Sequence, residues 1–441
     1  MIRPNLTLYQ WYIFSHSKDD QSRLSKEKEL QKKVSLFDAT AINIGAIIGV
    51  GIYVVTGVVA GLAGSDLVVS MILAAIVALF TALSYMELAA WLPAESGVYE
   101  YGNKLISPIA GFLGGWMWLL SNTLAGSAVC LGFAHYFGAF FPAIDYRITP
   151  ALVCLLFTIL YYFGIKESAK INDVLVATKL LILTFFIGFG FMFVKIQNFV
   201  PFQPLNAGVL FGAYYIFFAY GGFARVSVVA EEVVDAKRNV PRAIILSLLI
   251  STLFYILIGL VAVGLVGPVN LASSKSPLAT AITVTGSSVA VMLVSLGGLL
   301  STASVLLTSI LGVSRLAYSM ARKGDLPPSL NSVNSRFGSP TLAVMITGAV
   351  MALIAIFVDL TNVVSMSTFA MLFYYGVGNV SALRLKNRIY PKIFPVIGVV
   401  VCLTLLFFIF FLNPEEIIVG LTTILLSTIF YGAHQKIKLK L

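Results

Sequence analysis

The sequence predicts an all-α integral membrane protein with about twelve transmembrane helices. Hydrophobic residues make up 59% of the 441 residues and charged residues only 11%, whereas soluble proteins average roughly 25% charged residues. Apolar runs of about 20 residues, the length that crosses a bilayer, recur along the whole chain. Glycines interrupt two of these runs, in GAIIGVGIY (residues 45–53) and in FFAYGGF (residues 217–223).

The expected helices follow a polar, lysine-rich tail. They cover residues 36–62, 67–91, 108–140, 149–165, 170–196, 208–233, 241–267, 278–320, 341–359, 361–384, 393–412 and 414–433. The runs 108–140 and 278–320 are longer than one crossing needs, so we expect tilt or a surface extension there rather than extra crossings. The polar segment 92–105 predicts a short amphipathic piece along the membrane.

The distribution of basic residues assigns the two sides of the membrane. Most of the 29 Lys and Arg fall in the terminal tails and in alternate short loops, whereas the opposite loops carry only Arg147, Lys195 and Lys275. The positive-inside rule therefore predicts a multi-pass protein of the cell membrane with both termini in the cytoplasm. The net charge of +10 follows from this pattern, and no aromatic-basic module indicates a nucleic-acid partner.

Enzymatic chemistry is not expected. The chain has no Walker sequence, no metal-ligand spacing of Cys or His, and no buried pair of carboxylates. Its cysteines, Cys130, Cys154 and Cys402, lie in apolar runs without paired spacing, which is typical of packing residues. The sequence thus predicts neither a cofactor nor a metal site.

The two glycine-interrupted runs are the first and the sixth. Broken helices at corresponding positions of two halves are the best sequence indication of a transporter's binding site. We divide the chain into a tail (1–35), a first repeat of five helices (36–200), a second repeat (201–390) and a final pair of helices with a cytoplasmic tail (391–441). Because each repeat has an odd number of crossings, the second is expected to be inverted.

Several segments resemble the amino acid–polyamine–organocation (APC) superfamily, in particular prokaryotic amino acid permeases. They are GAIIGVGIY, PAESGVYEY, FFAYGGF with AEEVVDAKRNVPRAI after it, and SRLAYSMARKGDLPPSLNSVNSRFGSP. The resemblance implies a five-plus-five inverted-repeat fold with broken helices 1 and 6 that works by alternating access. Some family members carry an acidic residue after the helix 6 GF pair, where this chain has Ala224 and then Arg225, so a carboxylate switch is not available there.

An unwound helix offers free N–H groups to a carboxylate and free C=O groups to an ammonium group. With the family pattern, this places an amino acid's carboxylate on the amides of Gly49, Val50 and Gly51. The ammonium group is assigned to the carbonyls of Ala46, Ile47, Phe218, Ala219 and Gly221. The alternative is that these glycines only allow close packing of helices.

Aromatic and polar side chains near the breaks are further candidates. By resemblance to the aromatic gates of the family, Phe218 and Tyr220 close over the substrate, the alternative being ordinary packing. Asn122, in the third run, either faces the cavity or hydrogen-bonds to a neighbouring helix.

Arg225 is a cation inside the sixth run. It either lines a cytoplasmic vestibule and pairs with Glu87, Glu231 or Glu232 when the inner gate is shut, or it extends to the lipid headgroups.

Lys179 lies about seven residues inside the fifth run, roughly 10 Å deep. A charge at that depth costs at least about 2.5 kcal/mol. By resemblance, its ammonium group replaces the bound cation of sodium-coupled relatives, near the helix 1 break and helix 8, where Ser301 and Thr302 are expected neighbours. We hypothesise that Lys179 makes sodium unnecessary and couples transport to protons; the alternative is extension to the headgroups.

The sequence as a whole predicts a secondary active amino acid transporter that is sodium-independent and proton-coupled. An exchanger without ion coupling and a non-transporting amino acid sensor are the alternatives. No Asp or Glu is placed at the predicted midplane to meet a cationic side chain, which favours a neutral substrate because an unpaired second charge would be desolvated at a cost. The oligomeric state is not determined by the sequence.

Overall fold

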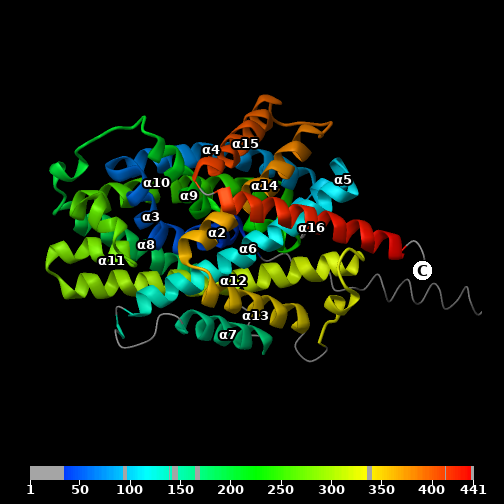
Figure 1. The fold of residues 1–441 in the computed structure, drawn as a ribbon, viewed down its shortest axis with the longest axis horizontal. Coiled ribbons are helices and arrows are strands. Elements are labelled where there is room, and N and C mark those ends of the chain that lie inside the picture. Colours follow the sequence, from blue (N-terminus) through cyan, green and yellow to red (C-terminus); the bar gives the residue numbers. More distant parts are fainter. Residues whose placement is uncertain are drawn as a thin grey trace, which may run out of the picture.

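The computed structural model describes residues 34–92, 97–138, 140–141, 148–163, 169–334, 340–412 and 414–438. Over these ranges the chain is a bundle of helices, and the single β-bridge within them joins Val34 to Val233 (Figure 1). Residues 1–33 of the expected tail lie outside the described residues.

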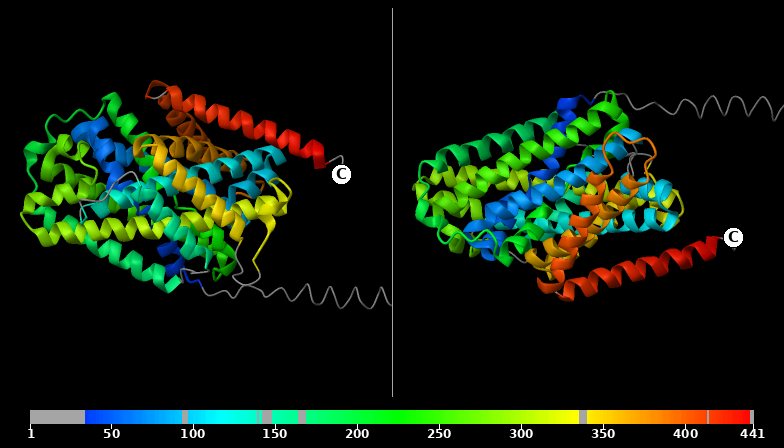
Figure 2. Two further views of the ribbon diagram at one scale, coloured as in Figure 1. Left: turned by 60° about the horizontal axis from the view of Figure 1, so that its bottom comes forward. Right: turned by 90° about the horizontal axis from the view of Figure 1, so that it is seen from above.

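The helices follow the order of the apolar runs. The α-helices are α2 (Leu36–Ile47), α3 (Thr56–Ala63), α4 (Leu67–Trp91), α5 (Gly97–Leu105), α6 (Pro108–Gly138), α7 (Thr149–Tyr162), α8 (Ala169–Phe191), α9 (Ala207–Tyr220), α10 (Ala236–Ala272), α11 (Pro277–Ile282), α12 (Ser288–Arg322), α13 (Thr341–Phe357), α14 (Leu360–Leu383), α15 (Ile393–Leu412) and α16 (Pro414–Lys438). The last of them, α16, runs along the outside of the bundle (Figure 2).

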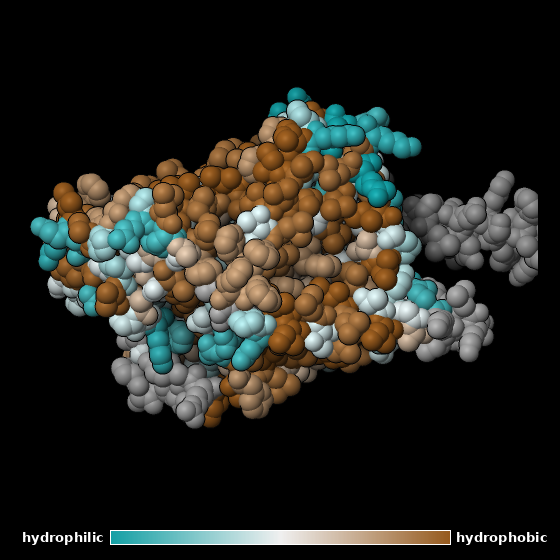
Figure 3. Space-filling model, turned by 45° about the horizontal axis from the view of Figure 1, so that its top comes forward, coloured by the Kyte–Doolittle hydropathy of each residue, from teal (hydrophilic) through white to brown (hydrophobic). Residues whose placement is uncertain are grey.

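The surface and the lengths of the helices suit a membrane. Within the described residues, 9 helical stretches are long and apolar enough to cross a bilayer. The first of them, Leu36–Trp91, contains α2, α3 and α4, and α7 and α13 are shorter apolar helices. Hydrophobic side chains cover a broad part of the surface, with hydrophilic ones gathered toward the ends (Figure 3). The all-α membrane class predicted from the composition is therefore confirmed.

One expected helix is divided. The sequence predicted tilt or a surface extension over 278–320, and the structure divides this run, because α11 ends at Ile282 and α12 begins only at Ser288. A 3-10 turn leads into Gly286, whose φ of +69° is a left-handed conformation that glycine adopts without strain. The Ser287 side chain then accepts a hydrogen bond from the Ala290 amide and caps α12. The amphipathic segment expected at 92–105 corresponds to α5.

Both glycine-rich runs are interrupted at the glycines. In the first run α2 ends at Ile47, and a π-helical turn, Gly51–Val55, precedes α3. In the sixth run α9 ends at Tyr220, Gly222 takes a φ of +107°, and the chain continues as a 3-10 helix over Arg225–Glu232. We call these two places the helix 1 break and the helix 6 break.

The two breaks touch each other through their backbones. A Cβ atom added to Gly51 would lie 2.4 Å from the Ala219 Cβ and 2.5 Å from its Cα. One added to Gly222 would lie 2.9 Å from the carbonyl carbon of Ala46. Each break therefore places a glycine against the other, and neither position has room for a side chain.

We predict that Gly51→Ala lowers the free energy of unfolding by about 1–3 kcal/mol or more, because the added methyl group meets backbone atoms that cannot rotate away. Gly188→Ala is the matched control, since nothing lies within 4 Å of its added Cβ and alanine is the better helix former. Thermal unfolding of the purified protein in detergent measures both. Equal melting temperatures for the two variants would contradict the contact.

Candidate functional site

A small cavity, which we call the central cavity, lies between the two breaks. All nine residues that the sequence predicted as substrate ligands line it. They are Ala46, Ile47, Gly49, Val50, Gly51, Asn122, Phe218, Ala219 and Gly221. Helices α6, α12 and α14 complete the wall with Ser121, Ser309 and Met371. The structure thus gathers the predicted ligands at one place, and their roles in binding stay a prediction.

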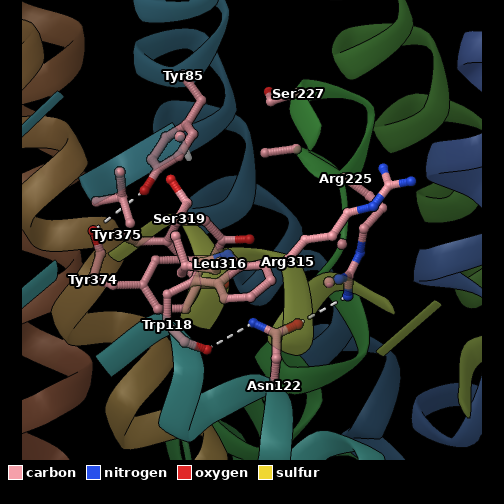
Figure 4. Close-up of a pocket in the computed structure, with 15 residues that line it drawn as sticks. Tyr85, Trp118, Asn122, Arg225, Ser227, Arg315, Leu316, Ser319, Tyr374 and Tyr375 are labelled. Carbon is pink, nitrogen blue, oxygen red and sulfur yellow. Dashed lines mark hydrogen bonds between the residues drawn. The ribbon is translucent and has the colours of Figure 1, made fainter. Parts of the chain in front are cut away.

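A second cavity, which we call the vestibule (Figure 4), shares lining residues with the first and extends to Gly97 and Val98 of α5. Asn122, Gly222, Arg225 and Tyr374 line both cavities. Among the described residues that line either one, none is Asp or Glu, whereas Arg225 and Arg315 are both cationic. The path from the vestibule to the helix breaks therefore carries positive charge only.

Arg225 lies where the two cavities meet. Its Nη2 atom donates a hydrogen bond of 2.9 Å to Asn122 Oδ1, and Asn122 Nδ2 in turn donates to the Trp118 carbonyl at 2.9 Å (Figure 4). The guanidinium carbon also lies 5.6 Å from the centre of the Trp118 ring, within the range of a cation–π contact. Asn122 thus faces the cavity and holds a cation there.

Glu87, one of the three predicted carboxylate partners of Arg225, is engaged elsewhere. Glu87 forms a 3.0 Å ion pair with Arg388 and accepts hydrogen bonds from the amides of Ile389 and Tyr390. In this structure Arg225 is bound by an amide instead. Its placement beside the vestibule agrees with the first of the two sequence alternatives.

Lys179, on α8, is fully buried and points into the helix 1 break. Its ammonium group donates to the carbonyls of Gly45 at 3.2 Å and Ile48 at 3.3 Å, and to the hydroxyl of Ser304 on α12. Three acceptors suit the three donors of an ammonium group. Extension to the headgroups is therefore wrong for Lys179, because its side chain is enclosed between α2, α8 and α12.

The α12 hydroxyl that Lys179 contacts belongs to Ser304 rather than to the expected Ser301 or Thr302. The Thr302 hydroxyl donates to the Gly298 carbonyl on its own helix, and the Ser301 hydroxyl has no hydrogen-bond partner among the described residues. All three side chains are buried. The rotation of α12 about its axis decides which of them meets α8.

Tyr220, the second predicted gate, does not line either cavity. Its hydroxyl donates to the Met71 carbonyl on α4, and its ring packs 5.1 Å from that of Tyr255. Phe218, two residues earlier on α9, does line the central cavity. A two-residue separation on a helix turns the two side chains to different faces.

Tyr255 on α10 was not predicted from the sequence. Its hydroxyl lies 2.8 Å from both the Ile47 and the Ala219 carbonyl oxygens, so one donor bridges the helix 1 break and the helix 6 break. These carbonyls are two of the five that were assigned to the substrate's ammonium group. A tyrosine in an apolar run has no sequence signal that separates this role from packing.

Long apolar helices around a central cavity, with two helices interrupted at its wall, define the class of multi-pass membrane transport proteins. The sequence model of the amino acid permease family matches residues 34–433, so the chain belongs to that family. This confirms the resemblance to the APC superfamily and supports amino acid transport.

Characterised relatives differ in what their names say they carry. The chain is 31% identical to a branched-chain amino acid permease of Bacillus subtilis, over 93% of this chain and 95% of the relative. It is 32% identical to a methylthioribose transporter of the same organism, over 84% and 85% of the two chains. It is 31% identical to the vacuolar cationic amino acid transporter 4 of Arabidopsis thaliana, over 77% of this chain and 61% of the relative.

We predict that Tyr255→Phe weakens amino acid binding by about three- to tenfold, because the carbonyls of both breaks lose their shared donor, a hydrogen bond worth about 1 kcal/mol. Tyr220→Phe is the matched control: it removes the hydroxyl of the neighbouring ring, which bonds to α4 and not to the breaks. Equilibrium binding of labelled amino acids and thermal unfolding are measured on both. An equal loss of binding in the two variants would contradict the bridging role.

Proposed function

We propose that this protein is a secondary active transporter of neutral amino acids that works by alternating access, independently of sodium and coupled to protons. The observation that carries the proposal is the central cavity, which lies between two helix breaks and has no acidic residue in its described lining. The basic loops further support a location in the cell membrane with both termini in the cytoplasm.

A zwitterion fits the polar groups of the two breaks. The amides of Gly49, Val50 and Gly51 stand where the chain resumes helical structure, which favours the substrate's carboxylate. The carbonyls of Ala46, Phe218 and Gly221 belong to residues that line the cavity and are the proposed acceptors for its ammonium group, with those of Ile47 and Ala219 shared with Tyr255. Phe218 is the proposed gate.

Twelve crossings and an inverted repeat are part of the proposal. Twelve result if Leu36–Trp91 counts as two crossings and the shorter helices α7 and α13 also span the bilayer. The breaks then open the two groups of five helices, 36–200 and 201–390. Gly51 of the first break lies against Ala219 of the second, and Gly222 of the second lies against Ala46 of the first. Two repeats that are inverted relative to each other would produce such a pair of contacts.

The charges along the path favour a neutral substrate over a cationic one. A second ammonium or guanidinium group would enter a region that already holds Arg225 and Arg315 and would find no carboxylate among the described lining residues. The substrates in the name of the branched-chain permease bring no second positive charge into this environment, whereas those in the name of the cationic transporter do.

Lys179 is the proposed coupling residue. Its ammonium group joins the helix 1 break to α12, the place that a bound cation holds in sodium-coupled relatives. A neutral amine has one donor fewer and no charge, so loss of the proton weakens the link between the break and α12. Opening of the central cavity toward one side of the membrane would then depend on whether Lys179 is protonated.

We predict that purified protein in liposomes accumulates neutral amino acids when a pH gradient is imposed and gains nothing from a sodium gradient. Uptake of a labelled panel, with each gradient and with neither, is the measurement. Flux that requires a preloaded second amino acid would make the protein an exchanger. Binding without flux would make it a sensor, and either result would refute proton-driven symport.

We predict that Lys179→Met lowers uptake by about tenfold or more and removes its response to the pH gradient, because methionine keeps the volume but leaves buried carbonyls without a donor. Lys195→Met removes a lysine from the exposed segment after α8 and serves as the control, with uptake expected to be unchanged. The proposal fails if Lys179→Met, shown to be folded by size-exclusion chromatography, keeps the same dependence on pH.

A further inference from the structure

Among the described residues, the groups that hold the cation of Arg225 are neutral. Asn122 and Trp118 contact its guanidinium group. Gly312 of α12 lies next to the remaining nitrogen, Nη1, and has no side chain to contact it. A Cβ added to Gly312 would lie 2.6 Å from Arg225 Nη1, so the glycine is what makes room for that nitrogen. The arrangement fixes the guanidinium group without neutralising it.

One nitrogen of this group is left for another partner. Arg225 Nη1 is buried and has no hydrogen-bond acceptor among the described residues. Buried polar groups are nearly always hydrogen-bonded, and a buried cation without a counter-charge is especially costly. Glu87 is already paired with Arg388, and none of the described lining residues is acidic. The missing acceptor is therefore expected from a molecule in the cavity.

The position of Arg225 indicates which part of the substrate supplies that acceptor. Arg225 lies where the central cavity meets the vestibule, and Gly49, Val50 and Gly51 line the same cavity from the helix 1 break. If those amides hold the substrate's carboxylate, the side chain is the part left to extend toward Arg225. The orientation of Asn122 supports this, because its amide oxygen already faces the cation.

We propose that Arg225 is a specificity-determining residue that binds an oxygen acceptor, an amide carbonyl or a carboxylate, at the end of the substrate's side chain. This inference rests on the proposed amino acid transport and deepens it: an amide side chain keeps the proposed neutral substrate, whereas a carboxylate side chain would replace it with an acidic one. A site built around a hydrogen bond rejects a molecule that lacks the partner, since the buried polar group is then left unpaired. Substrates with amide or carboxylate side chains are preferred over apolar ones of the same size, and cationic ones are the poorest.

The test is equilibrium binding of labelled leucine, asparagine, aspartate and lysine to the purified full-length protein. Leucine, asparagine and aspartate have side chains of nearly the same shape, so they differ mainly in the acceptor. We expect the wild type to bind asparagine, aspartate or both about tenfold or more tightly than leucine, and lysine most weakly. Comparing the affinities for asparagine and aspartate shows whether Arg225 prefers an amide carbonyl or a carboxylate.

Arg225→Gln should remove this advantage and leave the affinity for leucine within about twofold, since leucine makes no polar contact there. Arg315→Gln is the matched control, because it removes the same charge from the vestibule at a residue that does not line the central cavity, and the advantage should persist. Gly312→Ala is a second variant that keeps the charge but crowds Nη1, and it should also reduce the advantage.

Three results would overturn the inference. The first is that the wild type binds neither asparagine nor aspartate more tightly than leucine. The second is that Arg225→Gln still binds asparagine or aspartate more tightly than leucine. The third is that Arg225→Gln binds all four amino acids more weakly by the same factor, which would indicate that Arg225 contacts the part that they share. In each case leucine binding by the wild type leaves the proposed amino acid transport standing. If none of the four binds to the wild type, the proposed function fails together with this inference.

Discussion

The contact between the two helix breaks is the constraint on which the rest of the site depends. Gly51 lies on Ala219 and Gly222 on Ala46, at distances that no side chain would tolerate. Breaking two helices at the same depth frees backbone N–H and C=O groups, and such groups must find partners where water is scarce. The neighbouring helices therefore carry polar side chains at this level of an otherwise apolar bundle.

Two of those side chains serve carbonyls at or beside the breaks. Lys179 of α8 donates hydrogen bonds to the carbonyls of Gly45 and Ile48. The Tyr255 hydroxyl of α10 lies within hydrogen-bond distance of the Ile47 carbonyl in one break and the Ala219 carbonyl in the other. Each of these helices thereby fixes the position of the α2 end. The same bonds limit which carbonyls remain for a ligand, so the supporting residues shape the cavity without lining it.

Lys179, which is buried, and Arg225, which is partly buried, differ in what surrounds them. Lys179 is enclosed by oxygen acceptors from α2 and α12, which satisfy an ammonium group in a fixed arrangement. Arg225 lines the cavity and contacts an amide and an indole ring, and its Nη1 atom, beside Gly312, has no hydrogen-bond acceptor among the described residues. The first environment suits a residue that holds helices together, and the second suits one that meets a ligand.

The sequence by itself determined the membrane class and the positions of both breaks, because hydrophobic length and glycine content act locally along the chain. Together with the resemblance to the APC superfamily, it also predicted nine of the residues that line the central cavity. Only the tertiary structure decided that Ser304 and not Ser301 meets Lys179, that Tyr220 turns away from the cavity, and that Asn122 holds Arg225. These outcomes depend on the rotation and crossing of helices distant in sequence. The sequence of small polar residues on an apolar helix does not indicate which of these residues faces the neighbouring helix.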